Sequence, residues 1–173
     1  MRKHIMDFKN RTAIVTGGAR GIGRGIALAL AGRGANVIIA DLDEESAQRV
    51  VNEIKSGGSR SYFCETDVTQ QWSTDQMVEA TLEEYGNLDV LVNNAGVGGA
   101  PGFANRKIPN VEDWQQTFDV NVFGIVNCSQ SVENYMIDQS YGKIVNISSI
   151  AGRVGRSGFA TYAASKAAAI NVS

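Results

Sequence analysis

TAIVTGGARGIG, residues 12–23, passes from a short apolar run through a glycine-rich turn into a helical pattern. Its β-branched first part predicts a strand that is buried on both faces. Gly17 permits a tight turn after this strand, Gly21 lets the backbone approach a pyrophosphate, and Gly23 lets helix and strand pack closely. The stretch predicts a dinucleotide-binding turn, in which a helix N-terminus offers free N–H groups to phosphates. An ordinary strand-to-helix turn is the alternative, because short glycine patterns also occur by chance.

An acidic residue at a suitable distance favours the first interpretation. Asp41 ends the second apolar run about 20 residues after the glycines, where a carboxylate can accept hydrogen bonds from the adenosine ribose. A 2′-phosphate beside Asp41 would bring like charges together, so we expect the cofactor to be NAD rather than NADP. Arg20, inside the glycine loop, can either pair with a 2′-phosphate or remain a solvated surface charge.

Strand-like and helix-like patterns alternate along the whole chain. Five β-branched runs predict strands that are buried on both faces, at residues 12–16, 36–40, 61–64, 88–92 and 143–147. Helical spacing of apolar residues separates these runs, for example at Ile22, Ile26 and Leu30. Parallel strands need such crossover helices, so we expect an α/β fold: a doubly wound parallel sheet of the Rossmann type with at least five strands.

The longest helical pattern is a single stripe from Trp114 to Met136, with its members three and four residues apart. Asn110 and Asp113 stand where an N-cap and its N3 partner belong, so this helix is expected to begin near Asn110. Glycine-rich segments follow three predicted strands, at residues 17–23, 93–102 and 152–158. Ligands of such sheets bind at the carboxyl ends of the strands, so a site is expected among these segments.

The composition is that of one ordinary domain spanning residues 1–173. The chain has 16 Lys and Arg against 18 Asp and Glu, a net charge of −2, which argues against a nucleic-acid partner. No apolar run reaches about 18 residues and none follows the basic start, so we expect neither a membrane span nor a secretory signal, and a cytoplasmic protein. The only histidine, His4, is expected to be solvated, which excludes a catalytic histidine, and no metal site is expected.

Tyr162 and Lys166 are the residues with the clearest chemistry. They lie four residues apart in an alanine-rich helical stretch, so they share one helical face. Ser148 and Ser149 end the strand upstream, and the segment 152–158 can bring a serine hydroxyl, the phenol and the ammonium into one cleft. A nearby ammonium favours the ionised form of a phenol, so the cluster predicts an acid/base. A Tyr/Lys pair at this spacing is otherwise a common surface coincidence.

With these motifs in this order, residues 11–173 resemble a short-chain dehydrogenase/reductase with the Thr-Gly-x-x-x-Gly-x-Gly cofactor loop. The resemblance implies that Asp67 contacts the adenine and that residues 93–96 are the family's Asn-Asn-Ala-Gly segment. The implied cofactor-binding residues are Gly17, Arg20, Gly21, Ile22, Gly23, Asp41, Asp67, Val68, Asn94, Ala95, Gly96, Tyr162 and Lys166.

The resemblance also implies a catalytic set and a reaction, which is reversible hydride transfer between a nicotinamide cofactor and a secondary alcohol or ketone. Tyr162 would act as general acid/base and Lys166 would hold the nicotinamide ribose. Asn121 would position a relay water. Ser149 would donate a hydrogen bond to the substrate oxygen; it is preferred to Ser148 because it lies thirteen residues before Tyr162.

The sequence departs from the family pattern after Lys166, which only seven residues follow, whereas family members usually continue through two further strands and a substrate loop. We expect either an NAD(P)-dependent oxidoreductase acting on a small alcohol or carbonyl substrate, or a catalytically incomplete nucleotide-binding fragment or interaction module. The resemblance implies a homodimer or homotetramer. A sheet that ends at its fifth strand would leave a hydrophobic edge.

Overall fold

The computed structural model describes residues 7–105, 108–155 and 158–172. His4, expected to be solvated, lies outside these residues. The predicted strands form one parallel sheet in the order β3-β2-β1-β4-β5. Their bounds are β1 Thr12–Thr16, β2 Asn36–Asp41, β3 Ser61–Glu65, β4 Val90–Asn93 and β5 Lys143–Asn146. The predicted doubly wound α/β fold is therefore confirmed.

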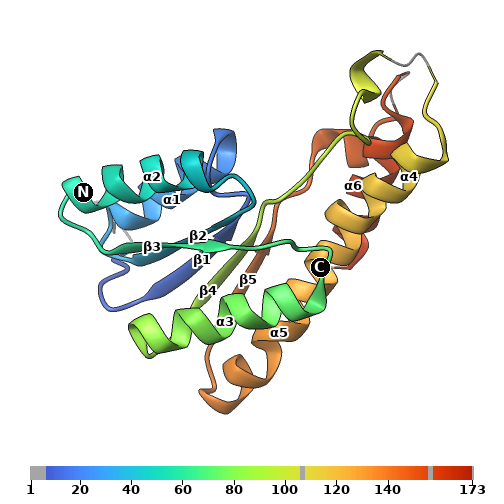
Figure 1. Ribbon diagram of the computed structural model, residues 1–173. Coiled ribbons are helices and arrows are strands. Elements are labelled where there is room, and N and C mark those ends of the chain that lie inside the picture. The colour runs from blue at the N-terminus through green and yellow to red at the C-terminus, as the bar shows by residue number, and fades with distance from the viewer. Residues whose placement is uncertain (1–6, 106–107, 156–157, 173) are drawn as a thin grey trace, which may run out of the picture.

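Helices cover both faces of the sheet (Figure 1). Helices α1 and α2 lie on one face and α3 and α5 on the other, while α4 and α6 pack together beyond the ends of β4 and β5. The helices are α1 Gly21–Ala31, α2 Glu44–Ser56, α3 Gln71–Tyr85, α4 Val111–Phe118, α5 Gly124–Asp138 and α6 Ala160–Asn171. Shorter helical turns are η1 Phe103–Asn105, η2 Asp119–Phe123 and η3 Ile150–Gly152. In the described part of the chain, no helix combines the length and apolarity that crossing a membrane requires.

Alternate residues of the central strands supply two separate cores. In β1, Ala13 and Val15 pack in the core beneath α1 and α2, whereas Ile14 packs in the core beneath α3 and α5. All three side chains are fully buried. Successive side chains of a strand point to opposite faces, so the central strands are fixed from both sides and hold the loops at their carboxyl ends.

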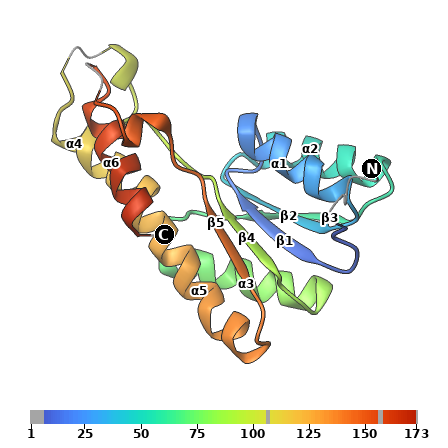
Figure 2. The ribbon, with the colours of Figure 1, turned by 180° about the vertical axis from the view of Figure 1, so that it is seen from behind.

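The prediction that all five strands are buried on both faces is wrong for β5. Within the described residues, β5 pairs with β4 alone, and Figure 2 shows it at the margin of the sheet. Ile144 and Val145 of β5 are 43% and 45% exposed. A strand with a neighbour on one side and incomplete helical cover leaves its apolar side chains in solvent, so the hydrophobic edge expected at the fifth strand is present.

Helix α1 forms where the four-residue repeat starting at Ile22 predicts it, and Ile26 and Leu30 pack partly buried against the core, but the fully buried residues are others. The buried residues are Gly23, Ala27 and Ala31, while Ile22 is 68% exposed. Small residues let the helix approach the sheet closely, so the larger side chains lie beside the contact rather than within it. Ile22 is consequently free to line the cleft described below.

The long stripe predicted as one helix is interrupted by a π-helical turn, η2, between α4 and α5. The predicted capping box is confirmed: Asn110 Oδ1 accepts from Asp113 N, and Asp113 Oδ2 accepts from Asn110 N, both at 2.9 Å. Trp114, expected in the stripe, is 40% exposed, whereas Asp113, Thr117 and Asn121 are buried. A π-helical turn adds a residue to the helical repeat, so the buried face moves relative to a regular α-helix.

Candidate active site

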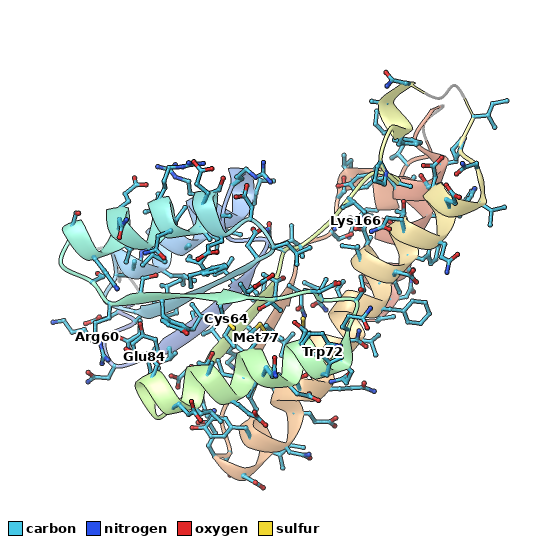
Figure 3. All side chains as sticks on the ribbon, in the orientation of Figure 1. Arg60, Cys64, Trp72, Met77, Glu84 and Lys166 are labelled. Atoms are coloured by element: carbon cyan, nitrogen blue, oxygen red, sulfur yellow. The ribbon has the colours of Figure 1, made fainter. Side chains whose placement is uncertain are left out.

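The carboxyl ends of the strands border one cleft of about 950 Å³. In Figure 3, Arg60 and Glu84 mark the end where β3 begins, and Lys166 lies at the opposite end of the sheet. Every residue predicted to bind the cofactor lines this cleft: Gly17, Arg20, Gly21, Ile22, Gly23, Asp41, Asp67, Val68, Asn94, Ala95, Gly96, Tyr162 and Lys166. The cleft lies where ligands of doubly wound sheets bind.

Three glycines of the loop after β1, Gly17, Gly18 and Gly23, have no room for a side chain. Gly17 has φ of +61°, a left-handed conformation that glycine adopts without strain. A Cβ on Gly23 would lie 2.1 Å from the carbonyl oxygen of Gly17, so α1 begins directly against the turn. Asn94 secures the loop from the end of β4, because its Nδ2 donates to the carbonyls of Thr16 at 2.9 Å and Gly17 at 3.0 Å. The result is an open cradle at a helix N-terminus, which suits a pyrophosphate.

Asp41, the predicted ribose ligand, is held by two backbone groups. Its Oδ2 accepts from Ala19 N at 2.9 Å and its Oδ1 accepts from Asp43 N at 3.1 Å. The side chain is half-buried and lines the cleft. Hydrogen bonds from backbone N–H groups orient a carboxylate, so a fixed negative charge lies beside the glycine loop.

Arg20, whose role the sequence leaves open, forms an ion pair at the rim of the cleft. Its Nη2 lies 3.1 Å from Asp43 Oδ2, and its side chain is 73% exposed. Asp43 caps α2 by accepting from Ser46 N at 3.0 Å and Ser46 Oγ at 2.8 Å. These hydrogen bonds, followed by the charges of Arg20 and Arg49, lower the pKa of Asp43. Sequence reasoning missed Asp43, although a second carboxylate two residues after Asp41 was a usable signal.

The loop between β3 and α3 places Asp67 and Val68 in the cleft wall. Asp67 Oδ1 accepts from Thr69 N at 2.9 Å and from Thr69 Oγ1 at 2.8 Å. The Val68 carbonyl accepts from Asn127 Nδ2 at 2.9 Å, so a hydrogen bond from α5 holds this loop in place. Asn127 was missed because nothing in the local sequence distinguishes it from a solvent-facing helical residue.

Tyr162 and Lys166 line the cleft together from α6, as their spacing predicts. Lys166 Nζ donates to the Ile147 carbonyl at 2.7 Å and lies 5.8 Å from the centre of the Tyr162 ring. The lysine is 4% exposed, and this burial lowers its pKa. A phenol and a buried ammonium thus lie in one cleft wall, on successive turns of the same helix.

Asn121 does not line the cleft but lies fully buried in η2. Its Oδ1 accepts from Val97 N at 2.8 Å, and its Nδ2 donates to the Val97 carbonyl and to Ser165 Oγ, both at 2.9 Å. A Cβ on Gly96 would lie 3.2 Å from Asn121 Oδ1 and 3.5 Å from Lys166 Nζ. The missing side chain of Gly96 therefore leaves these two polar atoms bordering the same small space.

The two candidate serines have different surroundings. Ser148 lines the cleft, and its Oγ donates to the Lys166 carbonyl at 2.8 Å. Ser149 is not among the lining residues; its Oγ accepts from Ala151 N at 3.2 Å and caps η3. The structure thus brings Ser148 into the wall that contains Tyr162, whereas the family resemblance favours Ser149.

Comparisons of sequence find relatives along almost the whole chain. The family model for short chain dehydrogenase matches residues 11–173. The chain is 38% identical over 161 residues to a 3-oxoacyl-[acyl-carrier-protein] reductase of Synechocystis, an alignment that covers 92% of this chain and 64% of that protein. It is 37% identical over 167 residues to the (2S)-[(R)-hydroxy(phenyl)methyl]succinyl-CoA dehydrogenase subunit BbsD of Thauera aromatica. This alignment covers 96% of this chain and 66% of that protein. The chain therefore spans slightly less than two thirds of the length of these curated relatives.

Solved structures show the same fold. An NAD⁺-bound xylitol dehydrogenase superposes with a TM-score of 0.89 at 30% identity, over 96% of this chain and 64% of that one. A short-chain dehydrogenase/reductase from Burkholderia phymatum in complex with NAD superposes with a TM-score of 0.88 at 30% identity, over 97% of this chain and 59% of that one.

Proposed function

Because the chain belongs to the short-chain dehydrogenase family, we propose that it binds a nicotinamide dinucleotide in this cleft and acts as an oxidoreductase on an alcohol or carbonyl group. The observation that carries the proposal is the position of Tyr162 and the buried Lys166 in the same cleft as the glycine loop. A bound nicotinamide would supply the hydride chemistry, while the protein supplies binding, orientation and a proton.

The cleft has the size and the polar groups that a dinucleotide requires. A volume of about 950 Å³ is at the upper end of the range of small-molecule sites. The open cradle at residues 17–23 would take the pyrophosphate on backbone N–H groups, and Asp41 would accept from ribose hydroxyls. Asp67 and Val68 would contact the adenine, and Lys166 would hold the second ribose.

We propose that the chain prefers NAD to NADP. The carboxylate of Asp41 is fixed by Ala19 N and Asp43 N, so it cannot turn away from a 2′-phosphate without breaking both hydrogen bonds. Like charges in a partly desolvated site repel each other. The NAD⁺ in the similar xylitol dehydrogenase and the NAD in the Burkholderia phymatum protein support the same preference.

The proton would be handled by Tyr162 and its neighbours. The Tyr162 hydroxyl would donate to a developing alkoxide or, in the other direction, accept from an alcohol. Asn121, which borders the space beside Lys166, would position the relay to solvent. Ser149, by its spacing from Tyr162, would donate to the substrate oxygen, and Ser148 is the competing candidate.

Nucleotide binding without turnover, as a fragment or interaction module, is the second candidate function. The observation in its favour is the apolar edge at β5, where Ile144 and Val145 stand partly in solvent. This edge lies apart from the residues that line the cleft, so the cleft can bind a nucleotide whatever covers β5.

The proposed partners are a small alcohol or carbonyl substrate and further copies of the chain. A homodimer or homotetramer through α4 and α6 is consistent with the apolar residues that α4 leaves in solvent, with Val111 80% exposed and Trp114 40% exposed. Exposed apolar clusters commonly mark interaction surfaces.

A titration with NADH, followed by nicotinamide fluorescence, tests the proposal. Saturable binding that adenosine 5′-monophosphate competes away is expected, because the two share the adenosine part of the cleft. Absorbance of the reduced nicotinamide with a panel of secondary alcohols then measures turnover. Binding with turnover supports the oxidoreductase, binding without turnover supports the second candidate, and absence of saturable binding contradicts both.

A further inference from the structure

The loop after β4 begins in the cleft wall and continues through residues 97–100, which include two successive glycines. Glycine leaves a backbone more conformational freedom than any other residue, so the position of this segment depends on the groups that bind it. Three fully buried side chains form hydrogen bonds with its backbone: Asn121 of η2, Thr161 of α6 and Asp113 of α4. The segment is therefore held in place by tertiary contacts.

Of these three side chains, Thr161 belongs to the helix that carries Tyr162. Thr161 Oγ1 donates to the Gly98 carbonyl at 3.2 Å, and Tyr162 is the next residue in the first turn of α6. Val97, the neighbour of Gly98, lines the cleft together with Tyr162. The hydrogen bond thus joins two parts of the cleft border, the loop after β4 and the start of α6.

The start of α6 depends on such a contact, because its own sequence supplies little to fix it. The N-cap residue is Phe159, whose side chain has no oxygen that could accept from the N–H groups of the first turn. The buried stripe of the helix repeats every four residues, at Thr161, Ser165 and Ala169. Ser165 accepts from Asn121 Nδ2 at 2.9 Å one turn further on, so Thr161 is the member of the stripe that holds the first turn.

We propose that Thr161 is a positioning residue, which holds the Tyr162 hydroxyl in its working position by joining the first turn of α6 to Gly98. The inference rests on the proposed oxidoreductase function. Thr161 is not among the described residues that line the cleft, so it acts through Tyr162 and not through a contact with the ligand. A displacement of about 1 Å at a reacting group can lower a rate by about 10²-fold, so one hydrogen bond at this place is able to affect turnover.

Steady-state kinetics of two substitutions tests the inference, with the alcohol that the wild-type chain oxidises fastest. Thr161→Val keeps the branched shape of the side chain and removes its hydroxyl, and it is expected to lower kcat about tenfold. Thr161→Ser keeps the hydroxyl and is expected to retain kcat within about threefold of the wild type. The dissociation constant of NADH should change by less than about twofold in both variants, because the pyrophosphate cradle lies outside α6. Thr161→Ala, which adds no atom near the Gly98 carbonyl, is expected to give the same loss of kcat and replaces Thr161→Val if the valine variant does not fold.

A Tyr162→Phe background shows whether Thr161 acts through the tyrosine. Without the hydroxyl that Thr161 positions, Thr161→Val is expected to lower the residual rate by less than about twofold. A loss that only disturbs the fold would instead be the same in both backgrounds.

Thr81→Val is the matched control. Thr81 is also fully buried, and its Oγ1 donates to a backbone carbonyl, that of Met77 at 2.7 Å, but it belongs to α3 and is not among the described residues that line the cleft. This substitution is expected to shift the urea midpoint as Thr161→Val does and to leave kcat within about twofold of the wild type.

Three results would each overturn the inference alone: unchanged kcat in Thr161→Val, an equal loss of kcat in Thr161→Ser or Thr81→Val, or a full loss that persists in the Tyr162→Phe background. A wild-type chain that binds NADH without turnover, or does not bind it, overturns the proposed oxidoreductase function and the inference with it.

Discussion

Asn121 binds both backbone groups of Val97, accepting from its N–H at 2.8 Å and donating to its carbonyl at 2.9 Å. The same side chain donates to Ser165 Oγ, which in turn donates to the Tyr162 carbonyl at 2.8 Å. One buried amide thus joins η2, the loop after β4 and the helix that carries Tyr162 and Lys166.

Asn121→Ala should lower the free energy of unfolding by about 2 to 4 kcal/mol, because it leaves buried polar groups of Val97 and Ser165 without partners. Urea denaturation measures the change. Gln115→Ala, at an exposed position of α4, is the control and should stay within about 0.5 kcal/mol of the wild type. Equal effects of the two substitutions would contradict the structural role of Asn121.

Two glycines of α1 should respond in opposite ways to the same change. Gly23→Ala would place a Cβ 2.1 Å from the Gly17 carbonyl oxygen and should destabilise the protein by at least about 3 kcal/mol or prevent folding. Gly25→Ala meets nothing within 4 Å and should stabilise it by about 0.5 to 1 kcal/mol through higher helix propensity. Thermal unfolding of both variants checks the pair, and a stable Gly23→Ala protein would rule out the close packing of α1.

The lowered pKa of Lys166 predicts a pH dependence of stability. Burial makes the folded state bind this proton more weakly than the unfolded chain, whose lysine titrates near the ordinary value of 10.5. Between the lowered pKa and 10.5 the unfolded state holds more protons, so stability rises with pH in that window. The difference in unfolding free energy between wild type and Lys166→Met should therefore grow in favour of the wild type as the pH rises from the lowered pKa towards 10.5. A difference that is flat or falls would show that the ammonium is not destabilised by burial.

Tyr162→Phe removes the hydroxyl and keeps the ring in the cleft wall. Turnover should fall by about 10²- to 10⁴-fold, the usual contribution of a general acid/base. NADH affinity should change by less than about threefold, which corresponds to less than 1 kcal/mol. Steady-state rates and a fluorescence titration separate the two effects; a normal rate would exclude Tyr162 as the proton donor.

The serines can be ranked by single substitutions. Ser149→Ala should lower turnover about 10²-fold if its hydroxyl stabilises charge on the substrate oxygen. Ser148→Ala should mainly cost about 1 kcal/mol of stability, because it loses the hydrogen bond to the Lys166 carbonyl. The reverse ranking in kcat would transfer the role to Ser148, as its place in the cleft suggests.

Features set by neighbouring residues could be predicted from the sequence. β1 begins and ends at the residues expected, because a β-branched run followed by glycines fixes both bounds. The glycine loop, Asp41 and the Tyr162–Lys166 pair all reach one cleft, because parallel strands bring their carboxyl ends to the same edge. The capping box of α4 follows from two side chains three residues apart.

Features set by packing could not be predicted. The apolar repeat from Ile22 locates α1 but not its most buried residues, which depend on how closely the helix approaches the sheet. In the π-helical turn η2, Asn121 forms hydrogen bonds with Val97 and Ser165, which lie far away in the sequence. No local pattern predicts these contacts. The ion pair of Arg20 with Asp43 and the hydrogen bond from Asn127 to Val68 both join residues that no local pattern relates.

The cleft draws its walls from residues 17–23 near the start of the described chain and from Tyr162 and Lys166 near its end. A ligand that needs both walls has no binding site in a chain whose last helix is undocked, so binding and complete folding are thermodynamically linked. Saturation at about 100 times the dissociation constant would add about 2.7 kcal/mol to the stability of the native state. The melting temperature would then report cofactor occupancy without any catalytic assay.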